Sequence, residues 1–559
     1  MVDNYYIADQ FSLLAKLMEM HGENSFRART YSSAAFAIEK ITQPLADMPE
    51  EKLVTIKGIG DSVAKKVIEI FQTGKLRALE EIIEKTPPGV LQMMSIKGLG
   101  PKKIATIWKE MGVESVGELL YACNENRLLL YKGFGQKTQQ SIQESIEFFM
   151  KNQGSHLYAE TEAFAAVIDA TLKKQFPDKL FALTGQFRRQ AEIIDRLEWV
   201  TTATDTELLA FLGANNYTTH ETLDDIVSVM GPENVLLKFY RATADSFYSV
   251  LFQTSGSEEF ITACAALPGF NVTASYKSEA EIFSALQLPV IAPAMREQAH
   301  VLKTVKDKPV TLITPGDIKG IIHSHSQWSD GVHTVEEMAK ACIAKGYEYL
   351  VISDHSKSAA YANGLTEERI REQHRYIDEL NEKLKPFKIF KSIECDILGD
   401  GALDYSNNVL ATFDLIIASV HSNLKMTEEK AMMRLLNAIR NPYTTILGHM
   451  TGRLLLSRPG YPVDHVTIIN ACLENQVVIE LNAHPRRLDI DWRWINYAIE
   501  KGVLISIDPD AHSVEGYDDC RYGVLAAQKG GLSKQQNLSS FTLAEFEDYI
   551  QKRRAAKSL

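Results

Sequence analysis

Apolar residues in the last third of the chain recur in short runs, separated by longer segments with helical periodicity. This alternation of strands with helices predicts parallel βα units, and repetition without a glycine-rich dinucleotide turn favours a closed barrel over an open sheet. The seven runs are IKGII (318–322), YLVIS (349–353), FKIFKSI (387–393), LIIASV (415–420), TTIL (444–447), VVIEL (477–481) and VLISI (503–507).

A different pattern occurs three times in the first third, at 53–71, 93–111 and 128–146. Each copy is an apolar helix end, a lysine, and then G-x-G opening an amphipathic helix. Closely spaced glycines permit a tight turn with positive φ, and the N–H groups at the start of the second helix form an anion site. Three copies predict sequence-independent binding of the DNA backbone. The residues concerned are Gly58, Gly60, Gly98, Gly100, Gly133 and Gly135, with Lys57, Lys65, Lys66, Lys97, Lys102, Lys103, Lys132 and Lys137.

Bulk composition limits the class of protein. A chain of 559 residues is longer than a domain with a single hydrophobic core, so we expect about three to five domains. The net charge of −12 gives no global attraction to phosphate, so DNA must be bound by local patches. Six scattered cysteines without a CxxC pair argue against disulfides and thiolate zinc fingers. No apolar run approaches about 18 residues and the start lacks a signal-peptide pattern, so we expect a cytoplasmic monomer without membrane contact.

Side chains suited to metal binding follow every predicted barrel strand, and such barrels place their active sites at the carboxyl ends of the strands. Neutral imidazole and carboxylate suit Mn, Zn or Fe(II). We expect about two or three divalent ions, with Mn favoured and Glu394 as the bridge, and a centre of this kind hydrolyses phosphoesters. The candidates are His323, His325, Asp330, His355, Glu394, His421, His449, His484, Asp510 and His512.

The middle third contains TGQFRRQAEIIDRLEWV (184–200), a glycine turn with two arginines before a strand-like run. Side chains alternate across a strand, so Asp195 and Glu198, three positions apart, point to opposite faces. This pair therefore cannot hold one metal ion.

The amino-terminal segment resembles that of the family X DNA polymerases. The resemblance covers HGENSFRARTYSSAAFAIEKI (21–41), the first hairpin and TGKLRALEEI (73–82). Within it, Lys66 falls at the family's Schiff-base lysine for removing a 5′ deoxyribose phosphate. Ser62 stands where a neighbouring lysine of that pattern is expected, which argues against lyase activity.

The segment 184–200 resembles the same family's palm motif, G-S-φ-R-R followed by D-x-D. The matching residues are Gly185, Phe187, Arg188, Arg189 and Glu192. Gln186 replaces the serine, Arg196 and Glu198 occupy the two metal-binding positions, and 234–244, where a third acid is expected, contains no carboxylate. Two-metal phosphoryl transfer needs clustered carboxylates, and an arginine repels the cation. The resemblance implies a palm and thumb that kept their shape and lost polymerase activity.

The last segment resembles the polymerase-and-histidinol-phosphatase (PHP) family over nearly its whole length, through HSHSQWSDG, SDHS, GHMTGRLLL, NAHPRRLDIDWRW and DAHS. The resemblance implies that every strand-end candidate except His484 is a metal ligand. His484 and Asp354 then orient ligands or substrate, with Glu394 and His484 as catalytic residues. Arg453 and Arg486 are candidates for holding a substrate phosphate.

The whole chain resembles a bacterial family X DNA polymerase with a carboxyl-terminal PHP domain. We therefore expect helical helix-hairpin-helix domains, a nucleotidyltransferase-like palm and thumb, and a distorted (β/α)7 barrel. The predicted function is a metal-dependent 3′ to 5′ exonuclease of DNA repair, with AP endonuclease or 3′ phosphodiesterase action as related chemistry, on gapped, primed or abasic DNA. The expected segments are 1–85 and 86–155 (hairpin domains), 156–233 (palm), 234–305 (thumb), 306–317 (linker) and 318–559 (PHP).

Three alternatives remain open at this point. One is an active gap-filling polymerase that recruits Asp195 or Asp205 as an unexpected metal ligand. Another is a phosphoesterase of small molecules. The third is a DNA-binding scaffold whose barrel holds metal only for stability.

Overall fold

The computed structural model describes the chain as two compact units, Met1–Gln153 and Gly154–Leu559. The described residues are 3–41, 43–56, 58–124, 126–151, 154–223, 225–231, 235–271, 273–307, 310–456 and 459–559. Lys57, one of the predicted hairpin lysines, and part of the predicted linker lie outside them.

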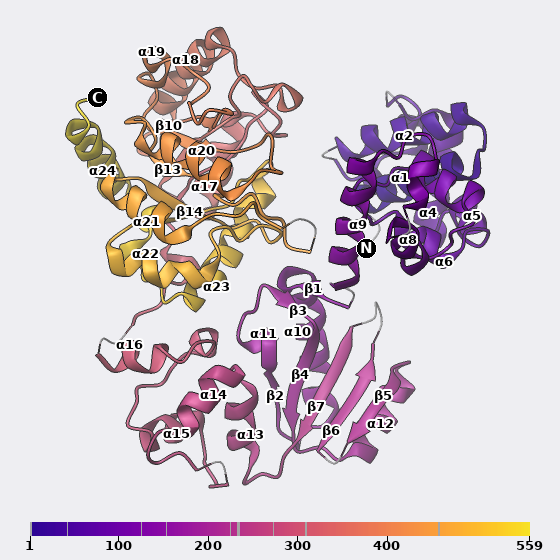
Figure 1. Ribbon diagram of the computed structural model, residues 1–559, viewed down its shortest axis with the longest axis vertical. Coiled ribbons are helices and arrows are strands. Elements are labelled where there is room, and N and C mark those ends of the chain that lie inside the picture. The colour runs from indigo at the N-terminus through magenta and orange to yellow at the C-terminus, as the bar shows by residue number, and fades with distance from the viewer. Residues whose placement is uncertain are drawn as a thin grey trace. The chain divides into compact units, whose positions relative to one another are not determined.

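The first unit is helical (Figure 1) and has a single hydrophobic core that runs from Ile7 to Ile146. The two expected hairpin domains are therefore one compact body, because their apolar faces pack into a common core. Its main helices are α1 (Asn4–His21), α2 (Ser25–Glu39), α3 (Glu50–Leu53), α4 (Asp61–Thr73), α5 (Arg77–Ile83), α6 (Pro88–Met93), α7 (Pro101–Ala105), α8 (Val116–Asn124) and α9 (Gln136–Lys151).

The three glycine repeats form the predicted turns. The first glycine of each is left-handed, with φ of 101° at Gly58, 89° at Gly98 and 95° at Gly133. The second glycine, as in Gly60 and Gly100, directly precedes the next helix as its N-cap. Only glycine adopts such φ values without strain, which explains the spacing of the motif. Lys66 is half-buried, whereas Lys102 is exposed.

The second unit begins with a five-stranded mixed sheet in the order β2-β4-β7-β6-β5. Its core stacks Trp199 on Phe239 with ring centroids 5.4 Å apart. The predicted palm boundary at 233 is wrong, because β7 pairs between β4 and β6 in the middle of this sheet. The strands are β2 (Phe181–Thr184), β4 (Arg196–Thr201), β5 (Thr218–Leu223), β6 (Ile226–Met230) and β7 (Leu236–Arg241).

A two-stranded ribbon and several helices accompany this sheet. A two-stranded ribbon of β1 (His156–Leu157) and β3 (Ile193–Ile194) lies beside it. The associated helices are α10 (Tyr158–Gln175), α11 (Gly185–Arg188) and α12 (Asp205–Ala214). A helical segment with its own aromatic core follows in α13 (Phe247–Thr254), α14 (Glu258–Ala265), α15 (Glu279–Ala285) and α16 (Val301–Asp307).

The carboxyl-terminal segment is the predicted barrel of parallel strands (Figure 1). Two parallel sheets, β8 to β10 and β11 to β15, are joined by the bridges Ser324↔Ala511 and His355↔Glu394. Strand β10 lies within the third predicted run and β11 begins directly after its end, so each of the seven predicted runs contributes a parallel strand and β11 is an additional one. The strands are β8 (Gly320–Ile321), β9 (Tyr349–Ile352), β10 (Lys388–Lys391), β11 (Glu394–Asp396), β12 (Ile417–Ser419), β13 (Ile446–Leu447), β14 (Val478–Asn482) and β15 (Ile505–Asp508).

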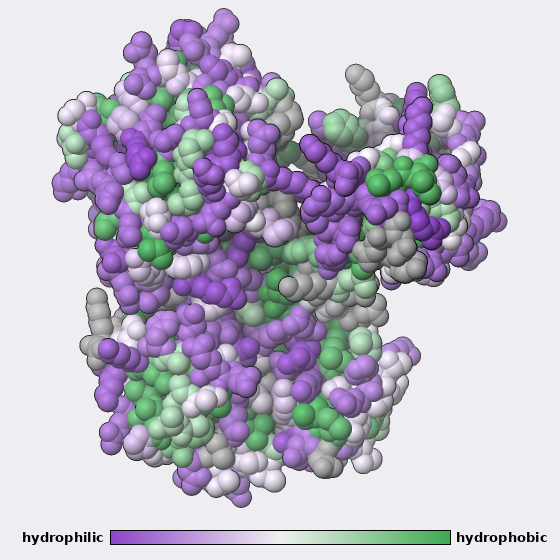
Figure 2. Space-filling model, in the orientation of Figure 1, coloured by the Kyte–Doolittle hydropathy of each residue, from purple (hydrophilic) through white to green (hydrophobic). Residues whose placement is uncertain are grey.

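Amphipathic helices cover the outside of these strands and bury apolar side chains such as Ile377 and Leu435. They are α17 (Val335–Lys345), α18 (Glu367–Lys383), α20 (Glu428–Arg440), α21 (His465–Glu474), α22 (Ile495–Lys501), α23 (Cys520–Lys529) and α24 (Leu543–Ala556). Hydrophilic residues predominate on the face shown in Figure 2. Within the described ranges, no helix has the length and apolar character needed to cross a membrane.

Candidate metal centre and degenerate polymerase site

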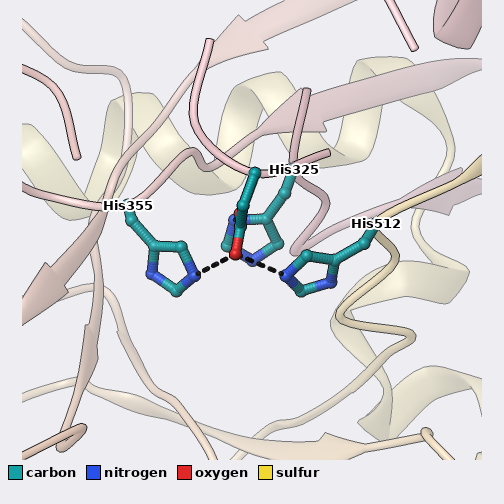
Figure 3. Close-up of side chains that lie close together, drawn as sticks. His325, His355 and His512 are labelled. Carbon is teal, nitrogen blue, oxygen red and sulfur yellow. Dashed lines mark ion pairs between the residues drawn. The ribbon is translucent and has the colours of Figure 1, made fainter. Parts of the chain in front are cut away.

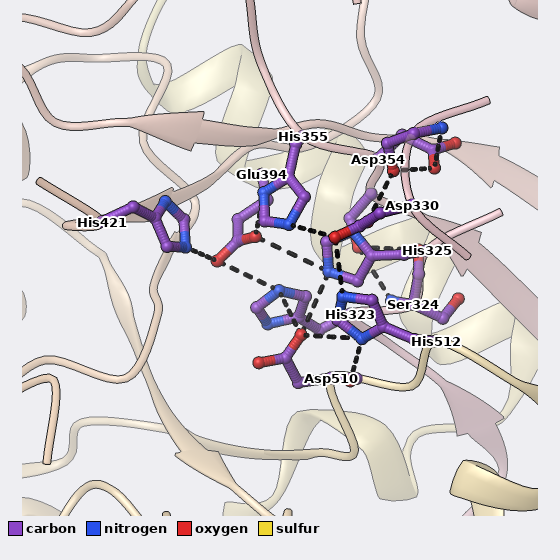
Figure 4. A network of polar contacts seen from close by, with 12 residues as sticks. His323, Ser324, His325, Asp330, Asp354, His355, Glu394, His421, Asp510 and His512 are labelled. Atoms are coloured by element: carbon purple, nitrogen blue, oxygen red, sulfur yellow. Dashed lines mark hydrogen bonds and ion pairs between the residues drawn. The ribbon is translucent and has the colours of Figure 1, made fainter. Parts of the chain in front are cut away.

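The strand-end candidates meet at one end of the barrel, because parallel strands present their carboxyl ends on the same side. Eight of them form three overlapping groups whose ligand atoms lie within 4.8 Å of one another. His449 joins them through Glu394, with Nε2 2.9 Å from Oε1. Figure 4 shows most of this network. The groups are His325, Asp330, His355 and His512; His323, His325, Glu394 and Asp510; and His355, Glu394 and His421.

Glu394 lies at the centre of the cluster. Its carboxylate is 3.0 Å from Nδ1 of His355 and 3.0 Å from Nε2 of His421. Burial alone would raise the pKa of Glu394, yet the surrounding imidazoles, His421 foremost, lower that pKa well below its usual range. The carboxylate is therefore ionised and placed between several nitrogen ligands, as a bridging group requires.

Asp330 forms a second focus nearer the solvent. Its Oδ2 lies 3.5 Å from Nε2 of His355 and 3.4 Å from Nε2 of His512 (Figure 3). Burial acts to raise the pKa of Asp330, but hydrogen bonds from these two histidines lower it. Two carboxylates thus face the same imidazole, His355, from opposite sides.

The electrostatics of the cluster fit divalent cations. Burial and the neighbouring His512 and His355 lower the pKa of His325 to about 3, so its imidazole is neutral. Its buried Nδ1 makes no hydrogen bond to the described residues. Burial acts to lower the pKa of His355, yet Glu394 and Asp330 raise it to about 10. Ionised carboxylates and a neutral imidazole are donors that divalent metals bind. The raised pKa of His355 shows that the cluster also favours a positive charge.

Two carboxylates that the sequence reasoning missed hold the ligands in place. Glu480 is fully buried and contacts Nδ1 of His323, while its other oxygen accepts the backbone N–H of His449 at 2.6 Å. Asp396 lies 2.8 Å from Nδ1 of His421. Such partners fix the ring orientation of a ligating histidine. Strand alternation gave a signal for Asp396, because it shares a strand face with Glu394.

Asp354 supports the loop that carries His325 and Asp330, as its expected orienting role requires. It accepts hydrogen bonds from the backbone N–H of Ser326 at 2.8 Å and from the hydroxyl of Ser329 at 2.6 Å. Gln373 on α18 donates to its other oxygen at 2.6 Å. The loop geometry therefore depends on a buried acid outside the cluster.

His484 lies at the rim of the cluster and belongs to none of its groups. Its Nδ1 accepts the backbone N–H of Arg486 at 3.2 Å. Burial lowers the pKa of His484 despite the opposing charge of Asp510. Its neighbour Arg487 places Nε 3.6 Å from Oδ2 of Asp510. This arginine was not singled out from the sequence.

The expected phosphate-binding roles of Arg453 and Arg486 do not fit their surroundings. Arg453 is largely buried and donates to Glu192 at 2.6 Å and to Asp491 at 2.8 Å. Arg486 points to the exposed Glu160, with Nη2 3.1 Å from Oε1. Both guanidinium groups pair with carboxylates outside the cluster, whereas Arg487 pairs with the cluster residue Asp510.

In the predicted palm site, the side chains of β4 and β7 pair with one another. Arg196 and Glu198 share one face of β4, and Nε of Arg196 donates to Oε1 of Glu198 at 3.0 Å. The same oxygen accepts the hydroxyl of Tyr240 at 2.8 Å. Lys238 lies opposite Glu198 in the register of β4 and β7. Positive charge and hydrogen-bond donors therefore surround the one buried acid.

The two arginines of the palm motif are also engaged. Arg188 belongs to the short helix α11 rather than to a strand end, and its guanidinium pairs with Glu279. Arg189 places Nε 3.1 Å from Oε1 of Glu297. Gly185 is left-handed, and a Cβ there would collide with the carboxylate of Glu198.

Known domain families match most of this architecture. Residues 2–76 match the helix-hairpin-helix domain, residues 90–147 the SAM-like helix-hairpin-helix tandem, and residues 322–484 the PHP domain. Together with the palm-type sheet, these matches define a DNA-binding enzyme that joins a polymerase frame to a PHP barrel.

A full-length relative makes the assignment specific. The chain is 32% identical over 560 residues to the DNA polymerase/3′-5′ exonuclease PolX of Bacillus subtilis (strain 168), across 96% of this chain and 98% of that protein. The chain therefore belongs to the family X DNA polymerases that carry a PHP domain, and the predicted family and fold class are confirmed.

Two further relatives match shorter stretches of the chain. DNA polymerase lambda of Rattus norvegicus is 32% identical over 117 residues, 21% of this chain and 19% of that protein. A protein named probable phosphatase from Acetivibrio thermocellus is 28% identical over 246 residues, 42% of this chain and 95% of that protein.

Proposed function

We propose that the chain is a metal-dependent phosphodiesterase that removes nucleotides from DNA 3′ ends, in the manner of a repair exonuclease. The observation that carries this proposal is the cluster of nine His, Asp and Glu side chains at the ends of strands β8, β9, β11, β12, β13 and β15, with Glu394 and Asp330 as its two foci. The hairpin turns supply the DNA-backbone contacts. The exonuclease named in the Bacillus subtilis relative agrees with this chemistry.

The nine side chains would hold two or three divalent ions, for which Mn, Zn and Fe are the candidates and Mn our choice. When bound, such ions activate water and stabilise the developing charge on a phosphoester. Glu394 holds its ionised carboxylate between the imidazoles, and Glu480 and Asp396 orient His323 and His421. His484, kept neutral by its lowered pKa, accepts or returns a proton at the rim.

Arg487 is proposed as the substrate-phosphate ligand. Its Nε lies 3.6 Å from Oδ2 of Asp510, a residue of the cluster. A guanidinium binds two phosphate oxygens at once, which would align the ester with the cluster. This assignment replaces Arg453 and Arg486.

The palm is proposed to be inactive as a polymerase. Arg196 pairs with Glu198 at the two positions where metal-binding carboxylates would be needed. Lys238, in the segment where the third carboxylate is expected, lies opposite Glu198. The alternative acids are occupied as well: Asp195 accepts a hydrogen bond from Gln186 at 2.8 Å, and Asp205 lies 3.1 Å from Nε of Arg241. These pairings support a palm without a polymerase metal site.

One experiment tests both parts of this proposal. Primed DNA labelled at its 5′ end is incubated with the full chain and Mn, with and without dNTPs. We expect shortening of the primer from its 3′ end and no extension. A His323→Ala variant should lose more than about 100-fold of the cleavage rate while still binding DNA. Extended products would overturn the inactive palm, and inertness with Mn, Zn and Fe would overturn the nuclease.

The similarity to a probable phosphatase over 95% of its length favours a second candidate, hydrolysis of small phosphomonoesters by the barrel. The DNA-binding hairpins of the first unit would have no role in the hydrolysis of such a small substrate. Comparing turnover of histidinol phosphate with cleavage of the labelled primer decides between them, because the favoured substrate should have the higher kcat/KM.

A further inference from the structure

The loop that contains the palm motif contacts the metal barrel through a buried ion pair. Glu192 follows the palm motif and its side chain is 9% exposed. It accepts a hydrogen bond at 2.6 Å from Nη2 of Arg453, which lies just beyond the strand-end ligand His449. The two residues are separated by 261 positions in the sequence.

Among the described residues, the other hydrogen-bond partners of Arg453 belong to one barrel loop. Its Nε donates to the carbonyl of Arg487 at 2.9 Å, its Nη2 also donates to the carbonyl of Leu488, and its Nη1 donates to Asp491 at 2.8 Å. Arg453 therefore ties the palm carboxylate to the segment 484–491. An arginine fork joins planar acceptors in fixed directions, so it transmits position as well as charge.

This barrel loop carries two side chains that face the metal cluster. Arg487 places Nε 3.6 Å from Oδ2 of Asp510, and the backbone N–H of His484 donates to Asn482, whose side-chain amide donates to Asp510 at 3.1 Å. Asp489 also ties the loop to the segment after His449, because it accepts the backbone N–H and hydroxyl of Thr451. A shift of the loop would displace the proposed phosphate ligand without moving the nine cluster residues.

The palm loop is itself rigid. Gln186, the residue that replaces the family's serine, donates to Asp195 at 2.8 Å and accepts its backbone N–H at 2.9 Å. The carbonyl of Glu192 accepts the backbone N–H of Tyr158 at 3.1 Å. Gln186, at the position of the family's serine, thus closes a loop whose acid Glu192 reaches the barrel.

We propose that Glu192 is a positioning residue of the metal centre: through Arg453, the degenerate palm fixes the barrel loop that carries His484 and Arg487. The proposal deepens the nuclease function and its kinetic part rests on it. It assigns the retained palm a role in phosphate binding at the barrel, beyond holding DNA.

The matched control is another palm carboxylate that points to the same loop. Glu160 pairs with Arg486 at 3.1 Å, but the two side chains are 43% and 51% exposed. Exposed pairs contribute little to position or stability because water screens them. Glu160→Gln therefore removes a palm contact of the same type without loosening the loop.

The first test does not depend on activity. Hydrogen exchange of the full chain is measured by mass spectrometry for the parent, Glu192→Gln, Glu192→Ala and Glu160→Gln. We expect exchange in 484–491 to be about 10-fold faster or more in both Glu192 variants. In Glu160→Gln, the exchange rate of this loop should equal that of the parent. Unchanged protection of this loop in Glu192→Ala would overturn the proposal even if the parent hydrolysed nothing.

The second test separates positioning from metal loading. Hydrolysis of bis(p-nitrophenyl) phosphate with Mn is measured together with bound Mn. We expect Glu192→Ala to raise KM by about 10-fold with kcat changed much less, and with bound Mn equal to that of the parent. A loss of bound Mn, or an unchanged KM in an active parent, would overturn the proposed role. An inactive parent would instead refute the proposed nuclease.

Discussion

At the residue scale, the metal centre depends on acids that lie behind its histidines. Glu480 contacts His323 and accepts the N–H of His449, so one buried carboxylate sets the position of two candidate ligands. Replacing such a partner leaves all the ligands present but frees a ring to rotate.

We expect Glu480→Gln to weaken Mn binding by about 10- to 100-fold, because the amide no longer fixes the tautomer of His323. Titration of the metal-stripped chain with Mn, followed by electron paramagnetic resonance, measures this affinity. Glu500→Gln, on the exposed face of α22, is the control. Equal Mn affinities for Glu480→Gln and the parent would refute the orienting role.

His374 gives a pH dependence that is independent of the cluster. It packs edge-on against Phe413, and burial lowers its pKa to about 4. In the unfolded chain this pKa is about 6.5, so between these values the unfolded state binds more protons. The histidine thus destabilises the fold as pH falls through this window and has no effect above it.

We therefore expect His374→Gln to reduce the loss of stability between pH 7.5 and pH 5 by on the order of 1 kcal/mol relative to the parent. Thermal unfolding at both pH values measures the difference. A variant that loses as much stability as the parent would show that His374 does not titrate in this window.

At the scale of elements, the hairpin turn depends on one left-handed glycine per repeat. Gly98 has a φ of 89° and open space around its Cβ position, so an alanine there meets no neighbour and is disfavoured by its backbone alone. This isolates the conformational requirement of the turn from packing.

We expect Gly98→Ala to cost about 1–2 kcal/mol of stability in the first unit and to weaken DNA binding several-fold, because the N–H groups of the turn move. Gly117→Ala, at an open helical position of α8, should be neutral or stabilising. Denaturant unfolding and fluorescence anisotropy with labelled DNA measure the two effects. Equal behaviour of both variants would refute the role of the left-handed turn.

At the scale of the whole molecule, DNA binding and metal chemistry are assigned to different units. The hairpins lie in the first unit and the cluster lies in the second. Ligands that bind only the folded state stabilise the part that binds them.

We expect chelation with EDTA to abolish cleavage and to lower the unfolding temperature of the barrel, while DNA affinity at constant salt changes less than about two-fold. Raising the salt should instead weaken DNA binding steeply and leave bound Mn unchanged. Calorimetry and anisotropy measure both responses. Loss of DNA binding on chelation would refute the division of roles.

The sequence by itself determined the barrel, the hairpin turns and the candidate ligands. Those features rest on local rules: strand and helix periods, the φ that only glycine tolerates, and the common end of parallel strands. The absence of the two expected palm aspartates could also be predicted, because Arg196 and Glu198 occupy their positions on one face of β4.

Only the tertiary structure decided which charged groups meet. Nothing local places Glu192 against Arg453, Glu480 against His323, or Arg487 rather than Arg486 beside Asp510. The position of β7 in the middle of the palm sheet is likewise a long-range pairing. A buried side chain takes its partner from whatever element packs against it, and that choice follows from the packing of the whole unit rather than from any stretch of sequence.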